Sequence, residues 1–147
     1  MSVTFSAADR FHPLHNGYLT LMTGDDGATY VSVEQLMMRA KADLFPGNEE
    51  VARKIMATTD YAQIKALGRQ VVGFDPIVWS AHCETIVERA CEIKFAQDVV
   101  ARAALLSTGD ATLAQESDTD AIWSSPGRSL MGRILERVRS RLWMHLL

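Results

Sequence analysis

An acidic and a basic side chain with a spacing suited to catalysis lie in residues 32–41. Glu34 and Lys41 are seven residues apart, a spacing that places them two turns apart on nearly the same side of an α-helix. Met37 and Met38 fall between them. A carboxyl group and an amine separated by apolar side chains would form the wall of a pocket, although exposed helices also carry such pairs as a solvated edge.

Two other places combine an aromatic ring with a polar group. Phe11 and His12 lie in a loop-like stretch, where functional groups often gather, although Phe11 could instead anchor that loop on the core. Asp120 precedes Trp123 by three residues in an irregular segment. The indole of Trp123 could stack on a flat ring of a ligand, or it could fill the core, which is its more common use.

Arginines gather around the last predicted helix, and they are Arg128, Arg133, Arg137, Arg139 and Arg141. Every fourth residue from 133 to 141 is an arginine, so three of them form one stripe on a helix. Such a stripe could bind phosphate groups. A solvated charged face is the alternative interpretation.

The chain has 147 residues and a formal net charge of −3, which is typical of one soluble domain and excludes a globally basic nucleic-acid binder. No apolar run reaches the length of a membrane span, and the first residues lack the features of a signal peptide, so we expect a cytoplasmic protein. Cys83 and Cys91 fall too far apart in one predicted helix to form a disulfide. Because no residues show metal-ligand spacing, we predict neither a metal nor a cofactor.

The pattern of apolar residues and helix caps predicts a single α+β domain over residues 1–147, mostly helical, with a small β region in the N-terminal third. Ser32 and Gln35 are expected to form a capping box for the helix that carries Glu34. Asp75 followed by Pro76 begins a long helix to about residue 97. The other predicted elements are strands at 3–5, 18–22, 29–31 and 111–115, helices at 48–57 and 60–68 capped by Asn48 and Asp60, and helices at 98–106 and 130–146.

Short motifs run through most of the chain in a characteristic order. They include Ser-Val-Glu-Gln-Leu-Met-Met-Arg-Ala-Lys at 32–41, Ala-Leu-Gly-Arg-Gln-Val at 66–71, Leu-Leu-Ser-Thr-Gly-Asp at 105–110 and Asp-Ala-Ile-Trp at 120–123. Together they resemble the NADAR superfamily (NAD- and ADP-ribose-associated proteins), which includes a bacterial N-glycosidase that acts on riboflavin-pathway intermediates. The resemblance depends on the number and order of the motifs and not on any one of them.

The resemblance implies hydrolysis of an N-glycosidic bond between a ribose carbon and an exocyclic amine. The catalytic residues it implies are Glu34, Lys41 and Asp120. Lys41 would form a Schiff base that water hydrolyses and Glu34 would transfer protons, whereas an oxocarbenium route with Glu34 alone is the alternative. The substrate-binding residues that it implies are Trp123, Phe11, His12, Trp79, Arg128 and Arg133.

Three functions stay open at this point. The resemblance favours removal of ADP-ribose from guanine in nucleic acid or nucleotides, and a phosphoribosylamino-pyrimidine metabolite is the second candidate substrate. A non-catalytic module that binds ADP-ribose or a nucleotide is the third, because the segment after Trp123 is shortened to residues 124–127. No membrane partner is expected, and the sequence does not indicate an oligomeric state.

Overall fold

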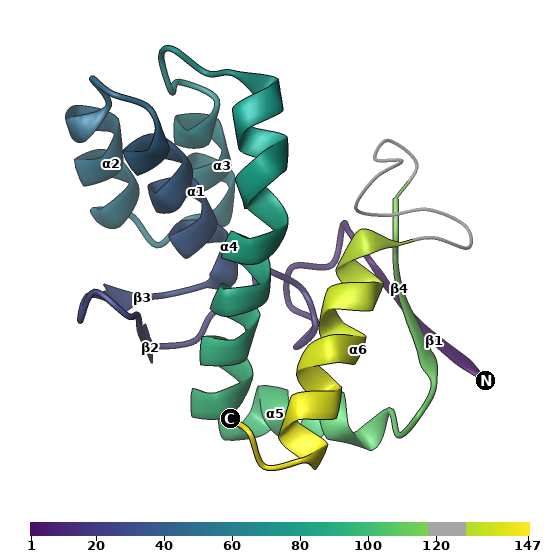
Figure 1. Cartoon of the computed structure of the whole chain (residues 1–147). Helices are drawn as coiled ribbons and strands as arrows, with labels where there is room; N and C mark the ends of the chain where they lie inside the picture. Colours follow the sequence, from purple (N-terminus) through teal and green to yellow (C-terminus); the bar gives the residue numbers. More distant parts are fainter. Residues whose placement is uncertain (118–128) are drawn as a thin grey trace.

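The structure, a computed structural model, describes residues 1–117 and 129–147. Its elements in chain order are β1 (Ser2–Ser6), β2 (Met22–Thr23), β3 (Thr29–Tyr30), α1 (Val33–Leu44), α2 (Glu49–Met56), α3 (Tyr61–Gly68), α4 (Pro76–Gln97), α5 (Val99–Ser107), β4 (Thr112–Glu116) and α6 (Leu130–Trp143). The long α4 runs through the molecule, with α1, α2 and α3 on one side and α6 with the β1–β4 pair on the other (Figure 1). The predicted α+β fold, mostly helical, is confirmed.

The strands of the described residues form two small sheets. β1 pairs with β4 in parallel, with Val3 opposite Leu113, so the first strand of the chain finds its partner far along the sequence. β2 is antiparallel to β3 and shorter than the strand predicted at 18–22. α6 packs directly on β4, since a Cβ atom added at Gly132 would lie 1.8 Å from the carbonyl oxygen of Leu113.

Capping hydrogen bonds predicted from the sequence are found at three of four positions. Ser32, Asp60 and Asp75 each accept a hydrogen bond from a backbone N–H in the first turn of α1, α3 and α4. Asn48 occupies the predicted N-cap position of α2, but its side chain makes no capping hydrogen bond. Its amide group instead bridges the α1–α2 turn to the residues after α3, where its Oδ1 accepts from the N–H of Val72 at 2.8 Å.

The side chain of Gln35 connects three segments instead of closing the predicted capping box. Its Oε1 accepts a hydrogen bond from the N–H of Val31 at 2.8 Å, one residue before the cap, and its Nε2 donates to the carbonyl oxygen of Ile55 at 3.0 Å. Because Gln35 is fully buried, these bonds are shielded from water. They hold the first turn of α1, which also carries Glu34, against the end of α2.

Two apolar cores hold the elements together. The larger one includes Phe95 of α4 and Ile134 of α6, and the smaller one includes Ile55 of α2 and Ile64 of α3. Met37 of α1 packs against both cores. The side of α1 that carries Met37 therefore lies where the two cores meet.

Within residues 1–117 and 129–147, no helix has both the length and the apolar character needed to cross a membrane. Cys83 and Cys91 are both buried free thiols on α4. The described part of the chain also contains no cluster of three or more histidine, cysteine, aspartate or glutamate side chains placed to hold a metal ion.

Candidate functional site

A pocket of about 480 Å³ lies where α1, α3 and α4 meet the loop after β1, the end of β4 and the start of α6. The loop contributes His15 and Asn16, α1 contributes Glu34, α3 contributes Tyr61 and Lys65, and α4 contributes Trp79. Its size falls within the usual range of small-molecule sites. Ionisable and aromatic side chains therefore converge on one cavity.

Glu34 is the buried acid of this pocket. It occupies the first turn of α1, its backbone N–H donates to the carbonyl oxygen of Asn16 at 3.0 Å, and the residue is only 6% exposed. Burial raises the pKa of Glu34 to about 7, while the charges of Lys65 and Lys41 pull it down to a smaller extent. At neutral pH the carboxyl group is thus poised both to give and to take a proton.

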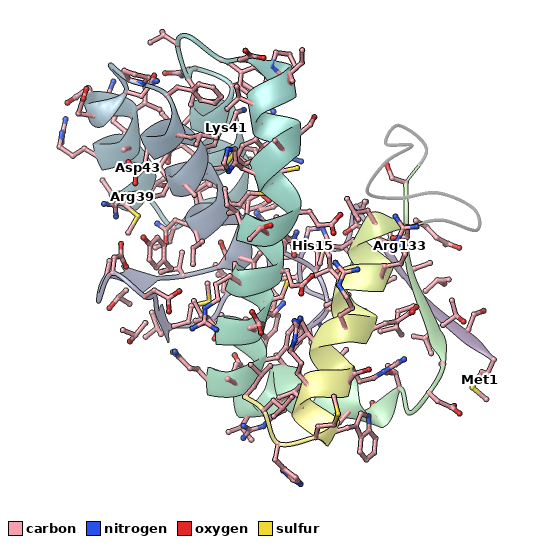
Figure 2. All side chains as sticks on the ribbon, viewed as in Figure 1. Met1, His15, Arg39, Lys41, Asp43 and Arg133 are labelled. Carbon is pink, nitrogen blue, oxygen red and sulfur yellow. The ribbon has the colours of Figure 1, made fainter. Side chains whose placement is uncertain are left out.

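Lys41 lies two turns along α1 and points to a different environment. Its Nζ donates to the carbonyl oxygen of Gly68 at 2.8 Å and lies 4.7 Å from the centre of the Phe74 ring. Burial lowers its pKa, which favours the neutral amine, and the charge of Glu34 acts in the opposite sense. Lys41 lies on the α1–α3 side of α4, away from His15 (Figure 2), and it does not line the pocket. Its predicted catalytic role stays a prediction.

Lys65 is the lysine that lines the pocket, and the sequence analysis did not single it out. Its Nζ lies 5.3 Å from the centre of the Tyr61 ring, one helical turn earlier on α3. The charge of Lys65 lowers the pKa of Glu34 more than the charge of Lys41 does. Lys65 gave no sequence signal, because its place in the pocket depends on how the short helix α3 packs against α1.

The loop after β1 also contributes residues that sequence reasoning missed. The imidazole of His15 is 3% exposed, with its Nε2 2.8 Å from the carbonyl oxygen of Ala7 and its Nδ1 2.8 Å from the N–H of Gly17. These partners fit a neutral ring that donates from Nε2, and burial accordingly lowers the pKa of His15. The Nζ of the buried Lys94 donates to the carbonyl oxygen of His15 at 2.9 Å and thereby ties the loop to α4.

The other predicted site residues are scattered. Trp79 lines the pocket together with Glu34. Phe11 is 74% exposed beside a second pocket of about 280 Å³, while His12 stacks on Phe5 and takes no part in the first pocket. Arg133 is exposed at the start of α6 (Figure 2). Asp120, Trp123 and Arg128 lie outside the described residues, and their roles stay predictions.

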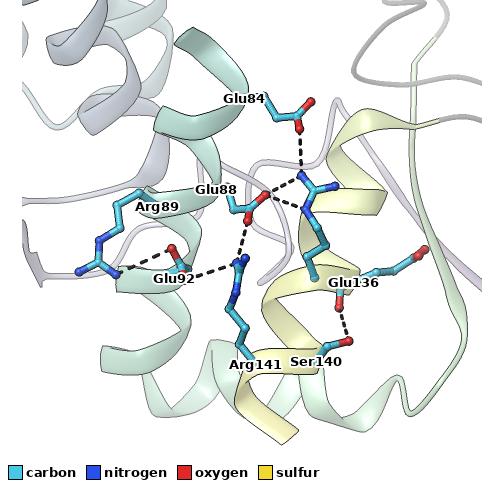
Figure 3. A network of polar contacts seen from close by, with 8 residues as sticks. Glu84, Glu88, Arg89, Glu92, Glu136, Ser140 and Arg141 are labelled. Carbon is cyan, nitrogen blue, oxygen red and sulfur yellow. Dashed lines mark hydrogen bonds and ion pairs between the residues drawn. The ribbon is translucent and has the colours of Figure 1, made fainter. Parts of the chain in front are cut away.

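The arginine stripe of α6 is occupied by protein carboxylates. Arg137 donates to Glu88 at 2.5 and 2.8 Å and to Glu84 at 3.1 Å. Arg141 contacts Glu88 at 2.7 Å and Glu92 at 3.4 Å (Figure 3). Both guanidinium groups therefore tie α6 to α4, which supports a structural role for Arg137 and Arg141, and phosphate binding by this stripe stays a prediction.

Arg139 is buried, with 7% exposed, and its Nη1 donates to the hydroxyl of Thr108 at 2.9 Å. It thus joins α6 to the end of α5. Among the arginines of α6, Arg133 is exposed, whereas Arg137 and Arg141 are half-buried and Arg139 is buried. Arg133 is therefore the arginine of this helix that is most accessible to a phosphate group.

Comparison with known proteins places these features in context. A family model described as the NADAR domain matches residues 2–143. N-glycosidase R617 of Acanthamoeba polyphaga mimivirus is 35% identical over 133 residues, which cover 80% of this chain and 78% of that protein. Protein irg-1 of Caenorhabditis elegans is 30% identical over 127 residues, 75% of this chain and 59% of that protein.

The fold is also similar to a solved structure. The NMR structure of the Escherichia coli protein YbiA matches with a TM-score of 0.78 and 22% identity, covering 99% of this chain and 89% of that one. At that identity the likeness supports the fold alone. The pocket and the sequence relatives carry the information on function.

Proposed function

The chain belongs to the NADAR domain family, and from this membership together with the pocket we propose that it is an N-glycosidase. The bond it cleaves joins a ribose carbon to an exocyclic amine, and ADP-ribose on guanine is the proposed substrate. The observation that carries the proposal is Glu34, a carboxyl group buried in the wall of a 480 Å³ pocket with its pKa raised to about 7. The similarity to a protein named N-glycosidase supports the same reaction class.

Glu34 has the properties that this reaction requires. When its protonated form transfers the proton to the exocyclic nitrogen, the bond from C1′ to that nitrogen breaks and the electron pair leaves with the amine. The resulting carboxylate then takes a proton from water as the water oxygen bonds to C1′. A carboxyl group that titrates near neutrality can perform both steps at the same pH.

Lys41 is proposed to supply a covalent intermediate. In this route the neutral Nζ of Lys41 bonds to C1′ while the bond from C1′ to the exocyclic nitrogen breaks, and the amine leaves with a proton from Glu34. The bond from C1′ to O4′ then breaks as Nζ loses a proton and O4′ gains one, which opens the ribose and gives the imine. Water hydrolyses this imine to free lysine and the sugar aldehyde. The lowered pKa of Lys41 supports this role. Since its Nζ is bonded to the carbonyl oxygen of Gly68, the side chain would have to leave that oxygen to reach substrate. The oxocarbenium route with Glu34 alone needs no such movement.

The other predicted substrate contacts are kept as proposals, and Trp79 is the one among them that lines the pocket of Glu34. The indole of Trp79 lines the cavity and is proposed to contact a flat ring of the substrate. Asp120 and Trp123 keep their proposed roles in orienting and stacking the substrate. Arg133 and Arg128 are the proposed phosphate contacts, and Phe11 with His12 would border the distal part of the substrate.

The experiment that tests the proposal compares three ligands. Purified protein is incubated with DNA carrying ADP-ribose on guanine, with a phosphoribosylamino-pyrimidinone and with free ADP-ribose, and the products are identified by mass spectrometry. Release of ADP-ribose and unmodified guanine is expected, and the Glu34→Gln variant serves as the control for contaminating activity. Conversion of the pyrimidinone alone would replace the substrate. Binding of ADP-ribose without turnover of either compound would overturn the N-glycosidase proposal and leave a binding module.

A further inference from the structure

Among the described residues, one buried side-chain polar atom lacks a hydrogen-bond partner, and it belongs to a residue of the pocket. Over residues 1–117 and 129–147, Oδ1 of Asn16 is a buried side-chain oxygen without any donor, and Asn16 lines the same pocket as Glu34. Its Nδ2 donates weakly to the sulfur of Met131 at 3.4 Å. Buried acceptors are nearly always satisfied in folded proteins, because an unpaired one costs free energy. An unpaired acceptor in a pocket wall is therefore a position where a ligand can supply the donor.

The protein holds Asn16 where it cannot find a partner of its own. Its carbonyl oxygen accepts from the N–H of Glu34 at 3.0 Å, which ties its backbone to the first turn of α1. The residues on either side are also fixed, since the carbonyl of His15 is bonded to Lys94 and the N–H of Gly17 to the His15 ring. The loop therefore has little freedom to move the amide group elsewhere.

Rotation of the amide group does not remove the problem. Turning it over would place Nδ2 in the position that lacks a partner and would set Oδ1 against the sulfur of Met131, which has no proton to donate. The observed orientation keeps the contact with Met131 and leaves Oδ1 as the unpaired acceptor. Asn16 lines the pocket, and its backbone carbonyl oxygen is bonded to the N–H of the buried acid Glu34.

We propose that Asn16 Oδ1 accepts a hydrogen bond from the exocyclic N–H of the substrate and thereby selects glycosylated amines over glycosides of ring nitrogens. The inference rests on the proposed function and adds the substrate feature that is recognised. An exocyclic amine that joins ribose to a base carries one hydrogen and one lone pair. Glu34 protonates the lone pair, and Asn16 accepts the hydrogen. A glycosylated ring nitrogen without a hydrogen leaves Asn16 unpaired, which disfavours its binding.

The test pairs a guanine ribosylated on its exocyclic amine with the same compound methylated at that nitrogen. Wild-type protein should bind the N–H compound at least tenfold more tightly than the N-methyl compound by calorimetry, with at least the same ratio in kcat/KM. Asn16→Leu, which has a similar size and no acceptor, should lose this preference. Asn16→Asp, which keeps an acceptor oxygen, should retain it. A preference that persists in Asn16→Leu would overturn the proposal.

Stability separates this role from a structural one. Because Asn16→Leu removes an unpaired buried acceptor, its midpoint of urea unfolding should equal or exceed that of the wild type. A less stable variant that loses affinity for both compounds equally would overturn the proposal, and Asn16→Ala repeats the comparison if leucine prevents folding.

Calorimetry also distinguishes this proposal from the proposed N-glycosidase activity. Selective binding without any turnover would contradict the N-glycosidase and still support Asn16, whereas turnover without selectivity would contradict Asn16 alone.

Discussion

Two carboxyl groups are held in opposite ways, Glu88 in the α4–α6 interface and Glu34 in the pocket. On the side that faces α6, burial would raise the pKa of Glu88, but hydrogen bonds from Arg137 and Arg141 outweigh that effect and the pKa is lowered. On the pocket side, the burial of Glu34 is opposed by two lysine charges that do not outweigh it, and its pKa rises to about 7. The same functional group is therefore held ionised on one side and near its titration point on the other.

The difference shows how this fold separates stability from chemistry. The α4–α6 interface is a network of ion pairs in which the partners satisfy one another (Figure 3). The pocket instead contains an acid that is costly to ionise and an amide oxygen without a partner. Groups that remain unsatisfied in a cavity are candidates for function, because folding alone gives no reason to keep them.

The largest effect is expected from a comparison of Lys41, which does not line the pocket, with Lys65, which does. With borohydride present during turnover, we expect a covalent adduct on Lys41, and we expect Lys41→Met to lose both the adduct and turnover because the imine cannot form. Lys65→Met is the matched control, since Lys65 lines the pocket and its charge acts on Glu34. It should keep the adduct and lower the rate to a smaller extent, because loss of the Lys65 charge raises the pKa of Glu34 further.

Peptide mapping by mass spectrometry locates the adduct. An adduct on Lys65 would exchange the roles of the two lysines. Turnover without any adduct would leave the oxocarbenium route, with Glu34 as the acid, as the operating mechanism. Each result shows which of the two lysines, if either, reacts with the substrate.

The second test removes the acid itself. Glu34→Gln should lower kcat/KM by about a hundredfold or more, the usual size of an acid–base contribution. In the wild type kcat/KM should fall as the pH rises through about 7, because the protonated acid disappears. Near-normal turnover by Glu34→Gln would remove this residue from the mechanism, and a pH profile unchanged by the substitution would do the same.

The same variant tests the stability difference between the two sides. The pKa of Glu34 is higher in the folded state than the ordinary value of 4.5 for an exposed glutamate. Its favourable contribution to stability is therefore complete below pH 4.5 and is lost as the pH rises through 7. Above that range the buried carboxylate costs at most about 3 kcal/mol relative to the protonated form. Urea unfolding should therefore find Glu34→Gln more stable than the wild type at pH 8, with the difference shrinking toward pH 5.

The sequence predicted the helices well because their signals are local. Ser32 and Asp75 cap helices through contacts two or three residues ahead, and such contacts leave a readable pattern. The strand at residues 111–115 was also predicted, but its pairing with β1 was not. That pairing joins segments separated by most of the chain, and no short-range pattern encodes it.

The site was only partly predictable for the same reason. Glu34 could be found because it shares a helix with Lys41 and the methionines. Lys65 and Asn16 come from separate segments, so their convergence depends on tertiary packing. The pairing of the α6 arginines was missed because the carboxylates that bind Arg137 lie on α4, about fifty positions earlier.

The smallest effect is expected on the other side of α4. The Arg137 side chain is 40% exposed and its partner Glu84 is 50% exposed, so Arg137→Ala should lower the free energy of unfolding by about 1 kcal/mol or less. It should leave kcat/KM unchanged, since the guanidinium group binds protein carboxylates.

Arg133→Ala is the matched control and should raise KM for a phosphate-bearing substrate without changing urea unfolding. If Arg137→Ala raised KM instead, with more salt-sensitive binding in the wild type than in the variant, substrate phosphate would compete with Glu88 for this arginine. The α4–α6 interface would then belong to the binding surface, and the separation between paired and unsatisfied charges across α4 would no longer hold.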